Sequence, residues 1–436
     1  MPDQLPRILI ISSTDPTTSL GAYALPFYTA LKNHGYEVDF LTKHRVKGHP
    51  EFDYLLDMTR WPNYIRYKLN KKINKRSIQK TLAVAQTGNH NFDYGREDDP
   101  PIAPELILKK IKKEYDIVFI VFWYQMISYQ TIEAIYNKLH CQIHLSCVDN
   151  QAVAGGCHFI GDCPRLSEGC GCCPGLVNGG MDDFTRFNVE FRRNVLKHVR
   201  PIIYGNTHMQ RINRRSALLK DYDRLETVYP LVDNEFYHPI EKSVARRQLN
   251  IDDSKKFIMF FGCSVLSEER KGMRYLIEAL ALFHEQLTEE QRKSVLLLIA
   301  GNFAEELVSK MPFEYRYLGY VALTQLPTIY STASAFVCPS TDDAGPSMVN
   351  QSLSCGTPII SFNIGTAIDM VLEQDTGYCA RLRDAADMAK GMMQLFSSTE
   401  ERYQEICTNC RNIALERTTE ASFVKTLQAS YEKYRL

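Results

Sequence analysis

The sequence predicts an α/β protein of two doubly wound, Rossmann-like domains that face one another across a ligand-binding cleft. The chain has 436 residues, more than one ordinary hydrophobic core accommodates, which favours two domains. Apolar runs of strand length alternate with segments of helical period, as is typical of parallel sheets with right-handed crossovers. This alternation is interrupted at residues 226–239, where two prolines lie among turn-forming residues. We therefore place the domain boundary there.

The first domain is predicted over residues 1–232. A helix is expected from Tyr23 to His34, directly after the first strand. Two segments do not follow the alternation: residues 45–105 are polar with a strongly basic portion, and residues 150–185 are rich in cysteine. The predicted strands of this domain are the runs RILIIS, EVDFLT, DIVFIVFW, QIHLSC and PIIYGN.

The second domain is predicted over residues 233–405. Its expected strands are buried runs that each end near Gly, Pro or Ser: KFIMFFG, SVLLLIAG, EYRYLGYV, SAFVCPS and TPIISF. Residues 406–436 have a helical period and a polar composition. We expect them to form a C-terminal helix that returns to the first domain.

The composition excludes several kinds of partner and location. Lys+Arg and Asp+Glu number 51 each, which argues against a surface built to bind nucleic acid. No uncharged apolar run reaches about 18 residues, so no membrane-spanning helix is expected. The first residues, MPDQLPRILIISS, lack the pattern of a secretory signal and resemble a first strand. We expect a cytoplasmic protein.

Two adjacent cations follow a predicted strand in FFGCSVLSEERKGMRYLIEALALF. Arg270 and Lys271 would lie at the start of the next helix, where backbone N–H groups and the helix dipole also favour anions. The stretch is consistent with a phosphate site, and equally with a solvated helix cap after two glutamates.

A second stretch makes the phosphate site the better interpretation. PSTDDAGPSMVNQSLSCGTPIISF resembles the donor-binding half of the retaining family-4 glycosyltransferases, which have the GT-B fold. That family has two glutamates eight positions apart before a CGTP-like turn, and here Asp343 and Gln351 occupy those positions. Further motifs of the family occur in the same order over most of residues 226–375: FFG with RKG, IAGN, YLGYV, LPTIYSTASAFVCPS and VYPLVDNEFYHP.

The resemblance implies a hexosyltransferase that takes a sugar from a UDP- or GDP-linked donor with retention of configuration. Arg270 and Lys271 would stabilise the charge on the departing diphosphate, so no catalytic metal is expected. Asp343 would contact the donor sugar, and Gln351 would hold ribose hydroxyls in place of a carboxylate. Further donor-binding positions implied by the resemblance are Gly21, Gly319, Gly345, Pro346, Ser347 and Met348. Glycoside hydrolysis is disfavoured, because it needs two carboxyl groups and Gln351 occupies one of the two positions.

One departure from the family concerns the catalytic centre. Relatives carry a His-Asp pair before the GGCH element, whereas this chain has Val148 and Asp149. Val148 cannot hydrogen-bond the donor, so His144, Asp149 or His158 takes that role or the chain is inactive. Asp149 is our catalytic candidate on this side. The alternatives are a non-catalytic GT-B protein that binds a glycan or a partner, and a nucleotide-sugar epimerase.

Five of the thirteen cysteines lie within GGCHFIGDCPRLSEGCGCCPG, residues 155–175. Four of them could bind a structural Zn²⁺ tetrahedrally and so fold a segment that has little apolar content: Cys157, Cys163, Cys170 and Cys173. Cys172 would then point away, and His158 could replace one thiolate. Disulfides are the alternative, and a redox role is disfavoured. The GGCH pattern resembles a subgroup that assembles bacterial capsule, exopolysaccharide or lipopolysaccharide.

The basic segment WPNYIRYKLNKKINKRSIQK, residues 61–80, is predicted to form an amphipathic helix. Its apolar residues recur every four positions: Trp61, Ile65, Leu69 and Ile73. Seven cations and no acid lie between Arg66 and Lys80, which is typical of a helix on an anionic membrane surface. The alternative is a packing helix with a solvated basic face. The membrane interpretation implies a peripheral protein with a lipid-linked glycan as acceptor.

Overall fold

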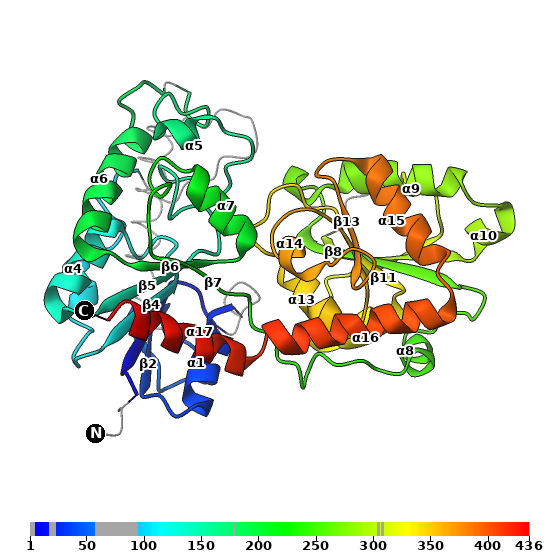
Figure 1. The fold of residues 1–436 in the computed structure, drawn as a ribbon, viewed down its shortest axis with the longest axis horizontal. Helices are drawn as coiled ribbons and strands as arrows, with labels where there is room; N and C mark the ends of the chain where they lie inside the picture. Colours follow the sequence, from blue (N-terminus) through cyan, green and yellow to red (C-terminus); the bar gives the residue numbers. More distant parts are fainter. Residues whose placement is uncertain are drawn as a thin grey trace. The chain divides into compact units, whose positions relative to one another are not determined.

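The computed structural model describes residues 5–16, 23–56, 95–177, 179–302, 306 and 309–435. The chain divides into two units, Met1–Leu231 with Glu420–Leu436, and Val232–Thr419. Each unit is a parallel β-sheet covered by helices on both faces (Figure 1). The α/β fold class predicted from the alternating pattern is therefore confirmed.

The first unit contains a seven-stranded sheet in the order β3-β2-β1-β4-β5-β6-β7, and all its pairings are parallel. Its strands are β1 (Ile8–Ser12), β2 (Val38–His44), β3 (Asp53–Leu56), β4 (Ile117–Phe122), β5 (Gln142–Ser146), β6 (Ile202–Gly205) and β7 (Leu225–Thr227). Its helices are α1 (Ala24–Asn33), α3 (Pro104–Leu108), α4 (Tyr129–Leu139), α5 (Arg165–Glu168), α6 (Phe184–Val199), α7 (Thr207–Arg215) and α17 (Glu420–Lys433). The pattern did not predict β3 and β7, which are short strands at the sheet edges.

The second unit contains a six-stranded sheet in the order β10-β9-β8-β11-β12-β13, again parallel. Its strands are β8 (Phe257–Val265), β9 (Val295–Asn302), β10 (Tyr315–Gly319), β11 (Ala335–Cys338), β12 (Ile359–Phe362) and β13 (Gly377–Ala380). Its α-helices are α8 (Lys242–Gln248), α9 (Met273–Glu285), α10 (Glu289–Lys293), α12 (Leu326–Thr332), α13 (Ser347–Ser354), α14 (Ala367–Met370), α15 (Ala385–Phe396) and α16 (Glu400–Arg417). Two 3-10 turns, η2 (Glu269–Lys271) and η3 (Leu323–Gln325), complete the unit.

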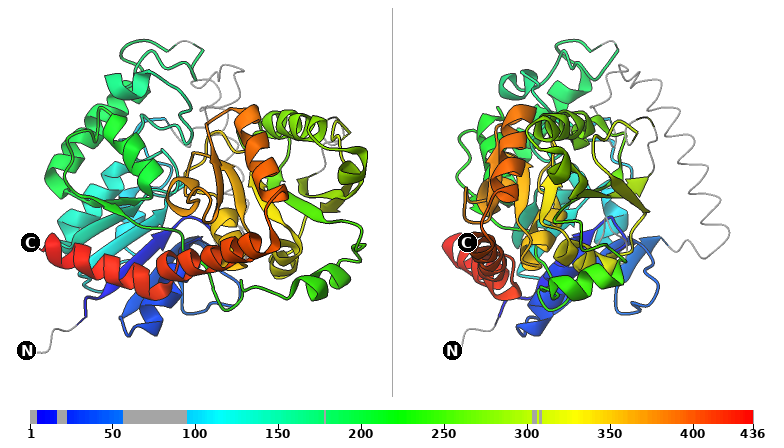
Figure 2. Two further views of the ribbon diagram at one scale, coloured as in Figure 1. Left: turned by 45° about the vertical axis from the view of Figure 1, so that its right-hand side comes forward. Right: turned by 90° about the vertical axis from the view of Figure 1, so that its right-hand side faces the viewer.

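The C-terminal segment is shared between the two units. We predicted that residues 406–436 return to the first domain, but α16 belongs to the second unit, whose core contains Ile406, Cys410 and Ile413. Only α17 packs on the first unit, beside α1, and Figure 2 shows α16 and α17 following one another. The buried face of α16 packs on α13 in the second unit, and the chain enters the first unit only at Glu420.

An aromatic cluster fixes α17 to the first unit. The ring of Phe423 lies 4.4 Å from that of Phe27 on α1 and 5.9 Å from that of Phe119 on β4. Val424 and Leu427 are buried in the same core. Burying each such side chain stabilises the fold by about 1.5–3 kcal/mol, so a helix from the end of the chain completes the core of its first domain.

Two sequence predictions fall outside the described ranges. Gly21, the predicted glycine of the opening loop, and the basic segment 61–80 both lie there. Among the helices that the structure does describe, none has the length and apolar character needed to cross a membrane.

Candidate functional site

A cluster of opposite charges lies at the carboxyl ends of two neighbouring strands of the second sheet. Arg270 and Lys271 follow β8 in turn η2, and Asp343 follows β11. Lys271 Nζ lies 2.7 Å from Asp343 Oδ2, and Arg270 Nη1 lies 3.4 Å from the same oxygen. Arg270 also donates through Nε to Glu268 Oε1 at 2.6 Å. The structure therefore brings together the two cations and the carboxylate that the sequence proposed as one site.

Burial and charge act against one another in this cluster. The side chains of Asp343, Lys271 and Arg270 are only 13%, 15% and 16% exposed. Burial raises the pKa of Asp343, but Lys271 and Arg270 outweigh it and hold the pKa below its ordinary value. Burial lowers the pKa of Lys271, and the neighbouring Asp343 carboxylate outweighs it, so that this pKa is raised. Both groups are therefore charged at neutral pH.

The backbone at Gly272 determines the shape of the cation loop. Gly272 has φ of +74°, and a Cβ there would lie 1.8 Å from the Pro339 carbonyl oxygen. The Thr341 N–H donates to the Arg270 carbonyl oxygen at 2.7 Å and ties the same two loops together. We predicted that the cations begin a helix. They lie instead in the 3-10 turn before α9, because Gly272 separates the two elements.

The other predicted donor-binding residues lie on two elements. Gly345 donates its N–H to Asp343 Oδ1 at 3.1 Å, beside the cluster. Pro346 precedes α13, and Ser347, Met348 and Gln351 lie on that helix. Gln351 Oε1 accepts a hydrogen bond from the buried Tyr330 hydroxyl at 3.1 Å. Gly319 ends the edge strand β10, which β9 and β8 separate from β11.

An aspartate-histidine pair follows β5 in the first unit. His158 Nδ1 lies 2.5 Å from Asp149 Oδ2, and the two side chains are 8% and 16% exposed. Because an ionised carboxylate only accepts, the histidine Nδ1 carries the proton of this bond. The other oxygen of Asp149 accepts from the Gln151 N–H at 2.8 Å. A polar pair thus lies where the chain has Val148 in place of the family's histidine.

His144, the third residue considered for this role, belongs to the core. It is fully buried on β5, with Nε2 3.0 Å from Gln142 Oε1 and Nδ1 2.9 Å from the Tyr204 hydroxyl. Burial lowers the pKa of His144 to about 3, so the ring is neutral at physiological pH. His144 therefore holds strands together, and Asp149 and His158 remain as the polar groups near this position.

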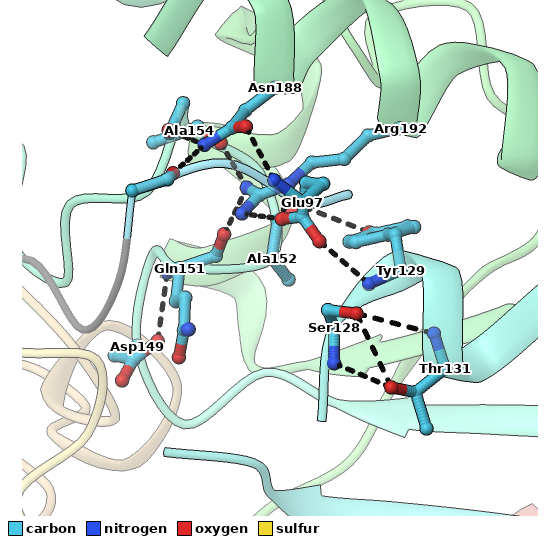
Figure 3. Close-up of polar contacts among 12 residues, drawn as sticks. Glu97, Ser128, Tyr129, Thr131, Asp149, Gln151, Ala152, Ala154, Asn188 and Arg192 are labelled. Carbon is cyan, nitrogen blue, oxygen red and sulfur yellow. Dashed lines mark hydrogen bonds and ion pairs between the residues drawn. The ribbon is translucent and has the colours of Figure 1, made fainter. Parts of the chain in front are cut away.

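A buried ion pair supports the loop that carries Asp149, and the sequence analysis missed it. Glu97 and Arg192 are 0% and 1% exposed, and Arg192 Nε lies 2.6 Å from Glu97 Oε1 (Figure 3). Arg192 also donates to the carbonyl oxygens of Gln151 and Ala154. A signal was present in the sequence, because Arg192 falls on the buried stripe of α6, which contains Asn188, Val195 and Val199.

The four predicted metal ligands lie in one segment. Burial raises the pKa of the Cys157 thiol, and the thiols of Cys170, Cys173 and Cys163 raise it further. Burial also raises the pKa of Cys170 and of Cys173, and the backbone of Gly155 and of Gly175, respectively, acts in the opposite direction. All thirteen cysteines lie in the described ranges and none forms a disulfide. Within those ranges no three His, Cys, Asp or Glu side chains are close enough to hold an ion.

Two doubly wound units, the second with paired cations at the carboxyl edge of its sheet, define a two-domain α/β protein of the GT-B type. Residues 241–413 match the family model described as Glycosyl transferases group 1. This match lies within the second unit, Val232–Thr419, and includes Arg270, Lys271 and Asp343.

Two solved structures share the fold of the whole chain. Sucrose-phosphate synthase from Thermosynechococcus elongatus superposes with a TM-score of 0.66 at 16% identity and covers 98% of both chains. HepE from Anabaena, solved with UDP and glucose, superposes with a TM-score of 0.57 at 12% identity, over 98% of this chain and 100% of that chain.

Two curated relatives match part of the chain. N-acetyl-alpha-D-glucosaminyl L-malate synthase from Bacillus anthracis is 22% identical over 256 residues, 58% of this chain and 62% of that protein. O-antigen chain mannosyltransferase B from Escherichia coli is 30% identical over 149 residues, 32% of this chain and 37% of that protein. The match therefore spans less than two thirds of either relative.

Proposed function

We propose that the protein is a retaining glycosyltransferase that moves a hexosyl group from a nucleotide-sugar to a growing, lipid-linked surface glycan. The observation that carries the proposal is the cluster of Arg270, Lys271 and Asp343 within the residues that match the glycosyltransferase group 1 model. The donor is a UDP- or GDP-sugar. UDP is the first candidate, because HepE, which shares the fold, was solved with UDP and glucose.

The cluster suits the chemistry of the departing diphosphate. When the bond from the sugar to the nucleotide breaks, negative charge grows on the leaving phosphate oxygen, and two fixed cations stabilise it. In the protein alone, carboxylates of Asp343 and Glu268 lie against these cations. The donor phosphates therefore compete with two carboxylates, and Asp343 becomes available to a sugar hydroxyl when Lys271 turns to the phosphate.

The Asp149–His158 pair is the proposed polar group on the acceptor side. The short contact from His158 Nδ1 to Asp149 fixes the ring orientation and makes the histidine a better acceptor at its other nitrogen. It would orient a hydroxyl of the sugar in place of the family's histidine. Retention of configuration comes from the resemblance to the family.

Donor turnover tests the proposal. The full chain is mixed with UDP-glucose, UDP-N-acetylglucosamine or GDP-mannose and a lipid extract as acceptor source, and nucleoside diphosphate release is measured. Release of UDP or GDP with transfer of the labelled sugar supports a transferase. Binding of the nucleotide without release indicates a binding protein, and isomerisation of the donor indicates an epimerase.

The membrane part of the proposal concerns the basic segment 61–80. Seven cations between Arg66 and Lys80 would attract an anionic leaflet and place the enzyme at the cytoplasmic face of the membrane. Cosedimentation with anionic liposomes should fall as salt rises, and fall further in the Trp61→Ala, Leu69→Ala double variant. Failure to sediment at low salt would contradict a membrane role for this segment.

A structural zinc ion is proposed for Cys157, Cys163, Cys170 and Cys173. The shared segment and the mutual influence of the thiols on their pKa values support it. The sulfur atoms would have to move closer together to bind an ion, because no three of them are at binding distance. The ion would hold the segment that carries His158 and would take no part in the reaction.

A further inference from the structure

We propose that Glu97, Arg192 and Asn188 form a positioning network for the Asp149–His158 pair. This inference rests on the proposed function, because it concerns the same site. Glu97 precedes α3, while Asn188 and Arg192 lie one turn apart on α6, so the network joins segments more than 90 residues apart in the chain.

Arg192 holds the loop between Asp149 and His158 by its carbonyl oxygens. Its Nη1 donates to the carbonyl oxygens of both Gln151 and Ala154, and its Nε donates to Glu97 Oε1 at 2.6 Å. Figure 3 shows the guanidinium between Glu97 and this loop, with Asp149 at the loop's far end. The planar guanidinium fixes both carbonyl directions at once.

Glu97 and Asn188 extend the network on either side. Glu97 Oε2 accepts from the Tyr129 N–H at 2.7 Å, and the Glu97 N–H donates to Asn188 Oδ1 at 3.0 Å. Asn188 Nδ2 donates to the Gly155 carbonyl oxygen at 2.9 Å. Side chains of α6 therefore hold three carbonyl groups of one loop.

Hydrogen bonds within the loop connect the network to Asp149 and His158. Asp149 Oδ1 accepts from the Gln151 N–H at 2.8 Å, and the Asn150 N–H donates to the His158 carbonyl oxygen at 2.9 Å. Fixing Gln151 thus fixes the direction of the Asp149 carboxylate. An apolar pair could stabilise the fold as well as a buried ion pair does, so the charges point to a role in geometry.

A double-mutant cycle tests the network in the full chain. Arg192→Met and Asp149→Asn are combined, and kcat and KM for nucleoside diphosphate release are measured with whichever donor of the panel is turned over. We expect Arg192→Met to lower kcat about tenfold or more with little change in KM, and to have little further effect in the Asp149→Asn background. Additive losses would overturn the proposal.

Arg411→Met is the matched control. Arg411 also donates to backbone carbonyl oxygens, those of Asn234, Tyr237 and Ser354, but in the second unit. Its loss should be additive with Asp149→Asn. If Arg192→Met does not fold, Glu97→Gln serves in its place, because it keeps the shape and removes the charge.

A spectroscopic measurement separates this inference from the proposed function. In protein labelled with ¹⁵N-histidine, the Nδ1 proton of His158 should give a low-field proton NMR resonance. This resonance should be absent in His158→Gln. We expect it to shift or broaden in Arg192→Met or Glu97→Gln and to persist in Arg411→Met. An unchanged resonance overturns the inference, whereas a change in a protein without turnover overturns only the proposed function.

Discussion

Lys271 Nζ lies 2.7 Å from Asp343 Oδ2, although 72 residues separate them in the chain. The contact exists because β8 and β11 are neighbours in the sheet, so the loops that follow them meet at one edge. The pair is mostly buried, and each charge holds the other in its ionised form. The first two predictions concern this pair.

Removing either cation should slow transfer. We expect Arg270→Ala or Lys271→Ala to lower kcat/KM by about tenfold to a thousandfold, the range for losing a group that stabilises transition-state charge. Arg274→Ala is the control, because Arg274 is 63% exposed on the next helix. Unchanged turnover in both cluster variants would contradict the phosphate assignment.

Acid should weaken the cluster. Because the folded pKa of Asp343 lies below the ordinary value of 3.8, its ionised form stabilises the fold above that pH. This contribution is lost as the pH falls through the folded pKa. We expect the free energy of unfolding of Asp343→Asn to fall less steeply below about pH 4 than that of the wild type. Urea titrations at each pH measure it, and Asp253→Asn is the control, because Asp253 is exposed.

Gly272 and Gly319 have similar positive φ angles, so comparing their alanine variants separates the effect of a steric clash from that of backbone strain. Gly272→Ala should lower the free energy of unfolding by about 1–3 kcal/mol more than Gly319→Ala. Both residues have positive φ, but only at Gly272 would the Cβ collide with a carbonyl oxygen, whereas at Gly319 nothing lies within 4 Å. Urea titrations measure both free energies of unfolding. Equal losses in the two variants would contradict the prediction, because they would mean that the loop moves to accommodate the Cβ of residue 272.

The aromatic cluster on α17 should control the stability of the first unit. Phe423→Ala should cost about 3–5 kcal/mol, as is usual for a buried phenylalanine. Leu415→Ala on α16 is the control, because Leu415 is 43% exposed. Hydrogen exchange in β1 and β4 measures the effect, and unchanged protection there would contradict it.

Zinc should be measurable if the cysteine segment binds it. Protein purified under reducing conditions should contain about one zinc per chain, and Cys170→Ser with Cys173→Ser should lose it. Cys172→Ser is the control, because Cys172 is exposed. Metal-free wild-type protein with an unchanged melting temperature would reject the ion.

The sequence predicted the sheets better than the contacts around them. Buried runs such as RILIIS became strands because apolar content and length decide that outcome locally. Arg270 and Asp343 were assigned to one site because their motifs resemble those of a glycosyltransferase family. The ion pair of Glu97 and Arg192 was not predicted, because 95 positions separate the two residues in the chain. In addition, Arg192 lies on a helix face where the pattern predicts apolar side chains.

The position of α17 affects the order in which the protein matures on the ribosome. Residues 232–419 are synthesised before Glu420–Lys433, so the second unit has all its strands while the first still lacks a helix. Until that helix is made, the surface around Phe27 and Phe119 has no cover from Phe423. The first domain to begin synthesis is therefore the last to finish folding, and its nascent form is an expected client for chaperones that bind apolar surface.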